Sequence, residues 1–380
     1  MAAETLPERE AEIRRRARGL AATLRGYELT VEDAAERAPT ALEREIVAHC
    51  VASGLFAPNL PKAMGGAGLS LREQVVIEEE LGGVTNWLWA ALWRPPNVLA
   101  QATPQQIERW VGPYTRGEAR GCYAITEPEA GSDVSQLRTV ALRDAGGWRI
   151  SGEKWFVTGG DVAGFALVVA GTETDHGYVP TIFFVARDAP GMRWGRQPAF
   201  TNHALYGHPE LTLENVRVTN DDVLGGVGSG ISLTHDWFRE ERLMIAARCI
   251  GAARRCLEEA QAWARQREAF GSAISEYQAV QWMLADAATE IQAARLMVYW
   301  AAAIKQSGQR YTKEAAMAKL FATEVSERVC RNAIQIHGGY GYSSEFPVER
   351  IYRDTRLMTI GEGTSEIQRL VIARHILNLG

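Results

Sequence analysis

The spacing of apolar residues divides the chain into three parts. In residues 1–118, apolar positions recur at helical spacing, most clearly in Ala41–Leu55 and Val75–Leu81. From about Gly121 the pattern changes to short runs rich in β-branched and aromatic residues, with turn-forming clusters between them. From Ile231 onward the helical spacing returns over long stretches. The pattern therefore predicts helical segments on both sides of a β region.

The β region contains five runs that predict strands, namely Trp148–Ile150, Lys154–Thr158, Phe165–Ala170, Thr181–Ala186 and Leu211–Val218. The last part carries one apolar helical stripe, made of Ala318, Phe321, Val325, Val329, Ala333 and Ile336. We predict an α+β fold with an N-terminal α-helical domain over residues 1–118, a middle antiparallel β domain over 119–228 and a C-terminal four-helix-bundle domain over 229–380.

Composition indicates the general class of protein. Of the 380 residues, 46% are hydrophobic and 23% are charged, which is the balance of a soluble globular protein. The net charge of -5 favours neither nucleic acid nor an anionic membrane as a partner. The five cysteines show no metal-ligand spacing, and no apolar run approaches the length of a membrane span. We expect a cytoplasmic protein with neither a metal site nor a membrane span.

The strongest candidate for chemistry lies near the C-terminus. Glu362 stands between Gly361 and Gly363, at a break between helical segments. Because glycine lacks Cβ, such a loop can bend and can let a flat ligand approach closely. A carboxylate on the loop can then point into a cleft, as a general base for a carbon acid must. From the local sequence alone, the alternative is a surface turn with a solvated glutamate.

More distant segments favour the first interpretation. The run Ile360–Gln368, with His337–Tyr342 before it, resembles the C-terminal signature of the acyl-CoA dehydrogenase family. Far upstream, Cys122–Asp133 closely resembles that family's flavin-binding segment, and Gly152–Gly160 resembles its next flavin contact. The segment Arg267–Gly271 resembles a further family motif, and all of these follow the family's order.

The resemblance implies that the protein binds FAD non-covalently. The residues that match FAD contacts are Tyr123, Ile125, Thr126, Ser132, Phe156, Thr158, Thr364 and Glu366, together with Arg267, Phe270, Gln278, Gln335, Gly338 and Gly339. In the family, the residues that match Arg267, Phe270, Gln278, Gln335, Gly338 and Gly339 contact the FAD of a neighbouring subunit. An arginine suits a pyrophosphate because its planar fork makes charge-assisted, paired bonds. The resemblance therefore implies a homotetramer, built as a dimer of dimers.

The resemblance also implies a reaction, the FAD-dependent α,β-dehydrogenation of an acyl-CoA thioester to the trans-2-enoyl thioester. The electrons would pass to an electron-transfer flavoprotein. Glu362 matches the base of most straight-chain enzymes, whereas Glu241 matches the base of isovaleryl-type and long-chain-type enzymes. We expect Glu362 to be the base, and we expect Glu241 to pair with a nearby arginine such as Arg242 or Arg248.

The substrate is less well defined by the resemblance. Ser132, Arg242, Gly361 and Gly363 match positions at the substrate, and Arg242 matches the arginine near the pantetheine–phosphate part of CoA. Two other reactions stay open, a flavin oxidase of the same fold and a dehydrogenase acting on an acyl thioester of acyl carrier protein. Catabolic and biosynthetic roles both stay open as well.

Gly361 bears on the shape of the acyl group. Straight-chain relatives commonly carry tyrosine at this position, so glycine predicts free space beside the reacting carbons and a branched or cyclic acyl group. The alternative is that Gly361 meets only a need for a positive φ and that a tryptophan from the N-terminal domain fills the space. The tryptophans Trp87, Trp89 and Trp93 are expected to pack in the core, with the lining of an acyl pocket as the alternative.

Overall fold

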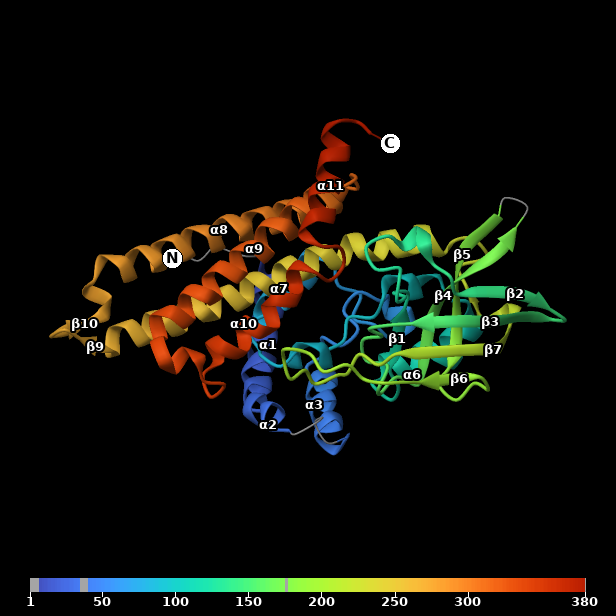
Figure 1. Ribbon diagram of the computed structural model, residues 1–380, viewed down its shortest axis with the longest axis horizontal. Coiled ribbons are helices and arrows are strands. Elements are labelled where there is room, and N and C mark those ends of the chain that lie inside the picture. The colour runs from blue at the N-terminus through green and yellow to red at the C-terminus, as the bar shows by residue number, and fades with distance from the viewer. Residues whose placement is uncertain (1–6, 35–39, 175–176, 380) are drawn as a thin grey trace.

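The structure is a computed structural model that describes residues 7–34, 40–174 and 177–379. Figure 1 shows a twisted β-sheet at one end of the molecule and long helices that extend away from it. The helices of the N-terminal part lie beside the region where the long helices meet the sheet (Figure 1). The predicted arrangement of an N-terminal helical part, a middle sheet and a C-terminal helical part is confirmed.

The N-terminal part is made of α-helices and single helical turns. The α-helices are α1 (Glu8–Arg25), α2 (Glu28–Glu32), α3 (Thr40–Ala52), α4 (Leu71–Leu81), α5 (Pro104–Gln106) and α6 (Gly112–Thr115). Helix α4 begins at a capping box, in which the Glu73 N–H donates to Ser70 Oγ and the Ser70 N–H donates to Glu73 Oε2. Trp87 lies in the main core and Trp89 and Trp93 pack against it, so the predicted packing role is confirmed.

The described part of the middle region forms an 8-stranded sheet in the order β6-β7-β3-β2-β4-β5-β8, with β1 beside β4. The strands are β1 (Gly121–Ala124), β2 (Val140–Asp144), β3 (Gly147–Lys154), β4 (Phe165–Thr174), β5 (Gly177–Ala186), β6 (Met192–Trp194), β7 (Leu211–Thr219) and β8 (Val223–Leu224). Most pairs are antiparallel, but β1 and β2 each pair with β4 in parallel. The parallel β2–β4 pair arises because β4 follows β3 in sequence but lies beside β2.

One predicted strand is corrected by the structure. The run Lys154–Thr158 was expected to be extended, but β3 ends at Lys154. Phe156 has a φ of 53°, in the left-handed region that ends a strand. The Trp155 N–H instead donates to the carbonyl of Thr126 at 2.8 Å, so this segment turns across the end of β1. The sequence pattern could not show this turn, because aromatic residues are typical of strands.

The C-terminal part is built on α7 (Gly230–Gln266), α8 (Gln278–Gln306) and α9 (Thr312–His337), with the shorter α10 (Pro347–Arg356) and α11 (Ser365–Ile376) packed against α9. Helix α7 has 37 residues and is therefore roughly 55 Å long. The hairpin of β9 (Glu268–Ala269) and β10 (Ser272–Ala273) joins α7 to α8 at the end that is far from the sheet (Figure 1). The predicted stripe of α9 lies inward, with Val325, Val329 and Ala333 buried.

Helix α4 packs on α7 through buried charges rather than through a purely apolar face. Glu78, Glu79 and Glu80 are at most 5% exposed. They are bound by arginines from other helices, including Arg248 at 2.6 Å from Glu78 and Arg295 at 2.8 Å from Glu79. The two helices cross closely at glycines, because a Cβ on Gly82 would lie 2.1 Å from the Arg248 carbonyl oxygen.

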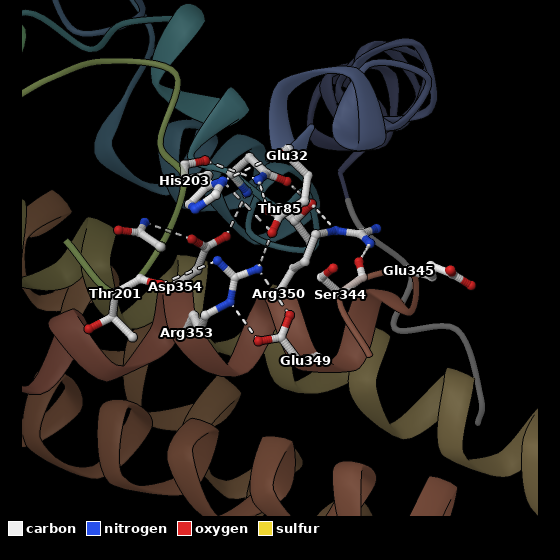
Figure 2. A network of polar contacts seen from close by, with 12 residues as sticks. Glu32, Thr85, Thr201, His203, Ser344, Glu345, Glu349, Arg350, Arg353 and Asp354 are labelled. Carbon is white, nitrogen blue, oxygen red and sulfur yellow. Dashed lines mark hydrogen bonds and ion pairs between the residues drawn. The ribbon is translucent and has the colours of Figure 1, made fainter. Parts of the chain in front are cut away.

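A second polar network connects α10 to the rest of the molecule. Figure 2 shows side chains of α10 pointing toward residues of the N-terminal and middle parts. Arg350 Nε donates to Thr85 Oγ1 at 3.2 Å, and Arg353 Nη2 donates to Glu32 Oε1 at 2.6 Å. Asp354 accepts a hydrogen bond from the loop between β6 and β7. The segment that precedes Glu362 is thereby fixed to both other parts of the fold.

No helix within the described ranges is long and apolar enough to cross a membrane. The same residues contain no group of three or more histidine, cysteine, aspartate or glutamate side chains placed to hold a metal ion. All five cysteines are buried free thiols.

Candidate active site

The candidate base lies on a short, tightly held loop between a 3-10 turn at Leu357–Thr359 and α11. Glu362 has a φ of 54° and Gly363 a φ of 95°, whereas Gly361 is not in the left-handed region. The part of the alternative in which Gly361 meets a need for a positive φ is therefore wrong. A Cβ placed on Gly361 would meet only the carbonyl oxygen of Leu357, at 3.8 Å, so this position has room for a side chain.

Glu362 is half-buried, and one of its two carboxylate oxygens accepts no hydrogen bond from the described residues. No donor among the described residues is within hydrogen-bonding distance of its buried Oε2 atom. Burial and then the charge of Glu241 raise the pKa of Glu362 to about 7, against the opposing charges of Arg242 and Lys319. A carboxyl group with this pKa and a free oxygen is suited to accept a proton near neutral pH.

The backbone on either side of the Glu362 side chain is held by long polar side chains. Arg242 Nε donates to the Glu362 carbonyl at 3.3 Å, and Lys319 Nζ donates to the Gly363 carbonyl at 2.8 Å. Gln368 Nε2 also donates to the Gly363 carbonyl at 2.8 Å. Sequence reasoning missed Lys319 and Gln368. The available signal for Lys319 was a single lysine on the alanine-rich inward face of α9.

Glu241 lies nearby on α7 but in a different chemical setting. Glu241 is 9% exposed. Its carboxylate pairs with Arg248 at 2.9 Å and with Arg94 at 3.1 Å. Although burial acts to raise it, these arginines hold the pKa of Glu241 below its ordinary value. The predicted pairing with Arg248 is confirmed. The contribution of Arg94, from the N-terminal part, was not predicted.

The first flavin-matching segment faces the Glu362 region. The hydroxyl group of Tyr123, on β1, is 2.6 Å from Thr234 Oγ1, and its ring centroid is 4.5 Å from that of Trp237. Burial raises the pKa of Tyr123, and the charge of Glu362 adds to this effect. The structure thus brings the end of β1, the first turns of α7 and the Glu362 loop together.

The turn after β1 is stabilised by a buried ion pair beneath it. Lys154 Nζ lies 2.7 Å from Glu127 Oε1 and also donates to the carbonyl of Ile125 at 3.1 Å. Glu127 additionally accepts the backbone N–H of Thr139 at 3.0 Å. Because the pair holds both ends of the turn, Ser132 is presented at the surface of the protein. This supporting role of Glu127 and Lys154 was not predicted.

The second flavin-matching segment places an aromatic ring at the surface. Phe156 is 47% exposed, and its left-handed backbone turns the chain away from the sheet. Thr158 Oγ1 is 2.9 Å from Nδ1 of His208, which lies on the loop before β7. An exposed ring beside a small hydroxyl-bearing residue is suited to a flat, polar aromatic ligand.

A separate groove of about 560 Å³ lies at the far end of α7. It is lined by Arg267, by Gly338 and Gly339, and by aromatic residues that include Trp263 and Phe346. A Cβ on either glycine would meet no atom within 4 Å, so the backbone here is open to an approaching group. Phe270, on the adjoining hairpin, is 99% exposed. Arg267, Gly338 and Gly339 were predicted to share one site, and the groove places them together.

Within one chain this groove is far from the Glu362 loop. Arg242 contacts that loop, and Arg267 follows it by 25 residues along α7, which corresponds to roughly 37 Å. Figure 1 shows the β9–β10 hairpin and the sheet at opposite ends of the molecule. Within one chain, the predicted FAD-contacting residues therefore include two separate clusters, one near the Glu362 loop and one in the groove at the end of α7.

Comparison with known proteins gives a consistent result along the chain. The N-terminal domain of acyl-CoA dehydrogenase matches residues 7–118, the middle domain matches 122–216 and the C-terminal domain matches 228–377. These matches include the Glu362 loop, the β1 segment and the groove at the end of α7.

Individual relatives agree with the domain matches. The mitochondrial short-chain specific acyl-CoA dehydrogenase of Bos taurus is 37% identical over 331 residues, which are 85% of this chain and 80% of that protein. The caffeyl-CoA reductase-Etf complex subunit CarC of Acetobacterium woodii is 34% identical over 340 residues, which are 88% of this chain and 90% of that protein. The solved structure of butyryl-CoA dehydrogenase from Megasphaera elsdenii has a TM-score of 0.90 and 29% identity, covering 98% of this chain and 99% of that one. The chain therefore belongs to the acyl-CoA dehydrogenase family of flavoprotein oxidoreductases that act on acyl-CoA.

Proposed function

We propose that this protein is an FAD-dependent dehydrogenase that introduces a double bond between Cα and Cβ of an acyl-CoA thioester, with Glu362 as the base. The observation that carries this proposal is the carboxylate of Glu362, which combines a buried oxygen lacking a donor with a pKa of about 7. Such a group can take the α-proton near neutral pH and then hold it away from water.

The contrast with Glu241 supports this choice of base. Protonation of Glu241 would leave the buried guanidinium groups of Arg248 and Arg94 without their shared counter-ion. Breaking up such a buried arrangement is costly, so Glu241 stays ionised. Because its charge also raises the pKa of Glu362, the two glutamates have different roles in one site.

The residues present fit FAD at both clusters. Near the sheet, Tyr123–Thr126, Phe156 and Thr158 would hold the flavin part, where the exposed ring of Phe156 offers an aromatic surface. The diphosphate part would be held by another copy of the chain, in the groove at the end of its α7. There, Arg267 and the open backbone of Gly338–Gly339 would contact it. When bound, FAD accepts the β-hydrogen as a hydride, which no side chain can do.

The remaining work of the site belongs to the protein chain. The α-proton of a thioester is weakly acidic, so the negative charge that develops on the carbonyl oxygen needs hydrogen-bond donors. We assign the backbone N–H of Glu362 as one such donor. We also assign Arg242, whose Nε donates to the Glu362 carbonyl, to the pantetheine–phosphate part of CoA.

The proposed electron acceptor is an electron-transfer flavoprotein, because the related CarC protein is named as a subunit of a reductase-Etf complex. The same relative also favours a second candidate, the reverse reaction, in which an enoyl-CoA is reduced. The same Glu362 would then return the proton to Cα. Further parts of the proposal are a homotetramer, a cytoplasmic location and domain limits at residues 118 and 228.

The test is an anaerobic titration of the flavin-loaded protein with butyryl-CoA, isovaleryl-CoA and acyl carrier protein thioesters. We expect an acyl-CoA to bleach the flavin absorbance, and air to restore it slowly. Glu362→Gln should bind the thioester without bleaching. Fast reoxidation by air would indicate an oxidase, and bleaching only by a carrier-bound thioester would indicate the carrier-dependent reaction. No bleaching by any thioester, with enoyl-CoA also inert toward the reduced flavin, would contradict the proposal.

A further inference from the structure

Lys319 is a fully buried lysine beside the Glu362 loop. It lies on α9 at 0% exposure, on a helix face whose neighbouring buried positions are alanines such as Ala315, Ala318 and Ala322. Its Nζ donates to the carbonyl of Gly363 at 2.8 Å. Placing a lysine amine in such surroundings costs free energy, because its charged form loses hydration. A buried lysine at this position therefore needs an explanation.

Hydrogen bonding of the Gly363 carbonyl does not by itself explain the lysine. Gln368 Nε2 already donates to the same carbonyl at 2.8 Å. The adjacent Glu362 carbonyl receives Arg242 Nε at 3.3 Å. A neutral donor from α11 would thus satisfy the Gly363 carbonyl, and what Lys319 adds is a positive charge on the α9 side of the loop.

The backbone of this loop also needs external support. Glu362 has a φ of 54°, a conformation that costs a non-glycine residue about 1–3 kcal/mol and persists only where neighbours hold it. The donors that hold the two carbonyls come from α7, α9 and α11, so they connect the loop to three helices at once. Loss of one donor should loosen the loop without unfolding the helices.

We propose that Lys319 is a positioning residue for Glu362, which fixes the carboxylate-bearing loop through the Gly363 carbonyl and favours the ionised form of the base through its positive charge. The inference rests on the proposed function, since it assumes that Glu362 is the base. It adds a role for a residue on α9 that lies outside every segment in which the family resemblance was first found.

Other charged groups also face Glu362. They are Glu241, Arg242 and Arg248 from α7 and the phenol of Tyr123 from β1, whereas Glu366 from α11 acts on Lys319. Arg248 is held by Glu78 and Glu241, and Arg242 is bonded to the loop carbonyl. Burial lowers the pKa of Lys319 to about 8, partly offset by Cys249 and Glu362, so its charge acts below that pH and fades above it.

The experiment compares Lys319→Gln and Lys319→Met with wild type, as the flavin-loaded enzyme. The glutamine keeps a hydrogen-bond donor and removes the charge, whereas the methionine removes both. Lys313→Gln is the matched control, because Lys313 lies on the same helix with a side chain that is 39% exposed. Two quantities are measured, the pH dependence of kcat and KM with butyryl-CoA, and hydrogen exchange of the backbone in residues 357–368.

We expect Lys319→Gln to shift the acidic limb of kcat to higher pH. Its kcat should fall roughly threefold to tenfold at about pH 6 but less than about twofold near pH 9, where wild-type Lys319 is itself neutral. KM should change little, because Lys319 is fully buried and its Nζ is bonded to the Gly363 carbonyl. Lys319→Met should show the same shift together with faster exchange in residues 360–364. Lys313→Gln should match wild type in both measurements.

An unchanged pH profile and unchanged exchange in a folded, flavin-containing Lys319→Gln enzyme would overturn the inference. If Lys319→Met fails to fold, Gln368→Leu removes the other donor to Gly363 while leaving Lys319 in place. That variant should speed exchange in the loop without moving the acidic limb, and a shifted limb there would also count against the inference. Full activity of Glu362→Gln would instead contradict the proposed function, so the two failures can be distinguished.

Discussion

Glu241 and Arg248 lie two turns apart on one face of α7, with Glu241 Oε1 2.9 Å from Nη1 of Arg248. The other carboxylate oxygen is 3.1 Å from Nη1 of Arg94, which comes from the N-terminal part of the chain. A carboxylate held between two buried guanidinium groups is a poor proton acceptor. The pairing therefore gives different electrostatic settings to two glutamates that looked like rival bases in the sequence.

The first prediction concerns these two residues. Glu362→Gln should retain FAD and acyl-CoA binding but lower kcat by at least roughly a hundredfold, because it removes the proposed general base and preserves the size of the side chain. Glu241→Gln should keep most of its kcat but lose about 1–3 kcal/mol of stability, because the two arginines lose a charged partner. Stopped-flow flavin reduction and urea unfolding measure the two effects. An inactive Glu241→Gln enzyme beside an active Glu362→Gln enzyme would reverse the assignment.

The second prediction concerns pH. In the proposed reaction the ionised form of Glu362 removes the proton, so kcat should rise with pH through an apparent pKa near 7. Glu241→Gln removes a charge that raises the pKa of Glu362, so its acidic limb should move to lower pH. This direction is opposite to the one expected for Lys319→Gln. The measurement is the rate–pH profile of wild type, Glu241→Gln and Lys319→Gln on one substrate. Shifts of the acidic limb in the same direction in both variants would contradict the opposite effects of these two charges on Glu362.

The third prediction concerns the acyl group. Gly361 is not in the left-handed region, and a Cβ there would meet only one atom within 4 Å, so larger side chains can be introduced without backbone strain. We expect kcat/KM for isobutyryl-, 2-methylbutyryl- or isovaleryl-CoA to exceed that for octanoyl-CoA. Gly361→Tyr should shift preference toward straight chains by ~1–3 kcal/mol per excluded methylene. Gly361→Ala serves as the control, and an unchanged ranking in Gly361→Tyr would show that this space does not select the substrate.

The fourth prediction concerns the groove at the end of α7. Arg267→Ala should weaken FAD binding roughly tenfold to a hundredfold, because a charge-assisted bond to a phosphate contributes about 1.5–3 kcal/mol. Arg265→Ala is a matched control, since Arg265 is an exposed arginine on the last turn of the same helix. Flavin retention during gel filtration with light scattering reports binding and oligomeric state together. A monomer with full FAD occupancy would exclude sharing of the cofactor between subunits.

The fifth prediction concerns the network around α10 in Figure 2. Arg350 is 3% exposed and lies 3.2 Å from Glu28 Oε2, so Arg350→Met removes a buried charge together with its contacts to Glu28 and Thr85. We expect a loss of about 3 kcal/mol in the free energy of unfolding. Arg369→Met, which removes a surface pair with Glu324, should cost less than about 1 kcal/mol. Equal losses in the two variants, measured in urea, would show that the network does not stabilise the fold.

The local pattern of side chains was sufficient to predict the general architecture, and the resemblance of the motifs was sufficient to predict the family. The apolar stripe of α9 and the runs that became β4, β5 and β7 follow from side-chain periodicity, which depends only on neighbours in sequence. The glycines around Glu362 likewise indicated a sharp loop. The extended run predicted at Lys154–Thr158 was wrong because an aromatic residue, Phe156, adopts a left-handed backbone that its type does not suggest.

Only the tertiary structure decided how charge is arranged in the interior. The run Glu78–Glu80 looks like a solvated helix face, yet it is buried because arginines from distant helices converge on it. The same is true of Glu241, whose partner Arg94 is 147 residues away. Whether a carboxylate is held ionised or poised near neutral pH depends on burial and on charges from other elements. The sequence alone therefore named Glu362 and Glu241 as candidates, and the packing of α4, α7 and α9 separated their chemistry.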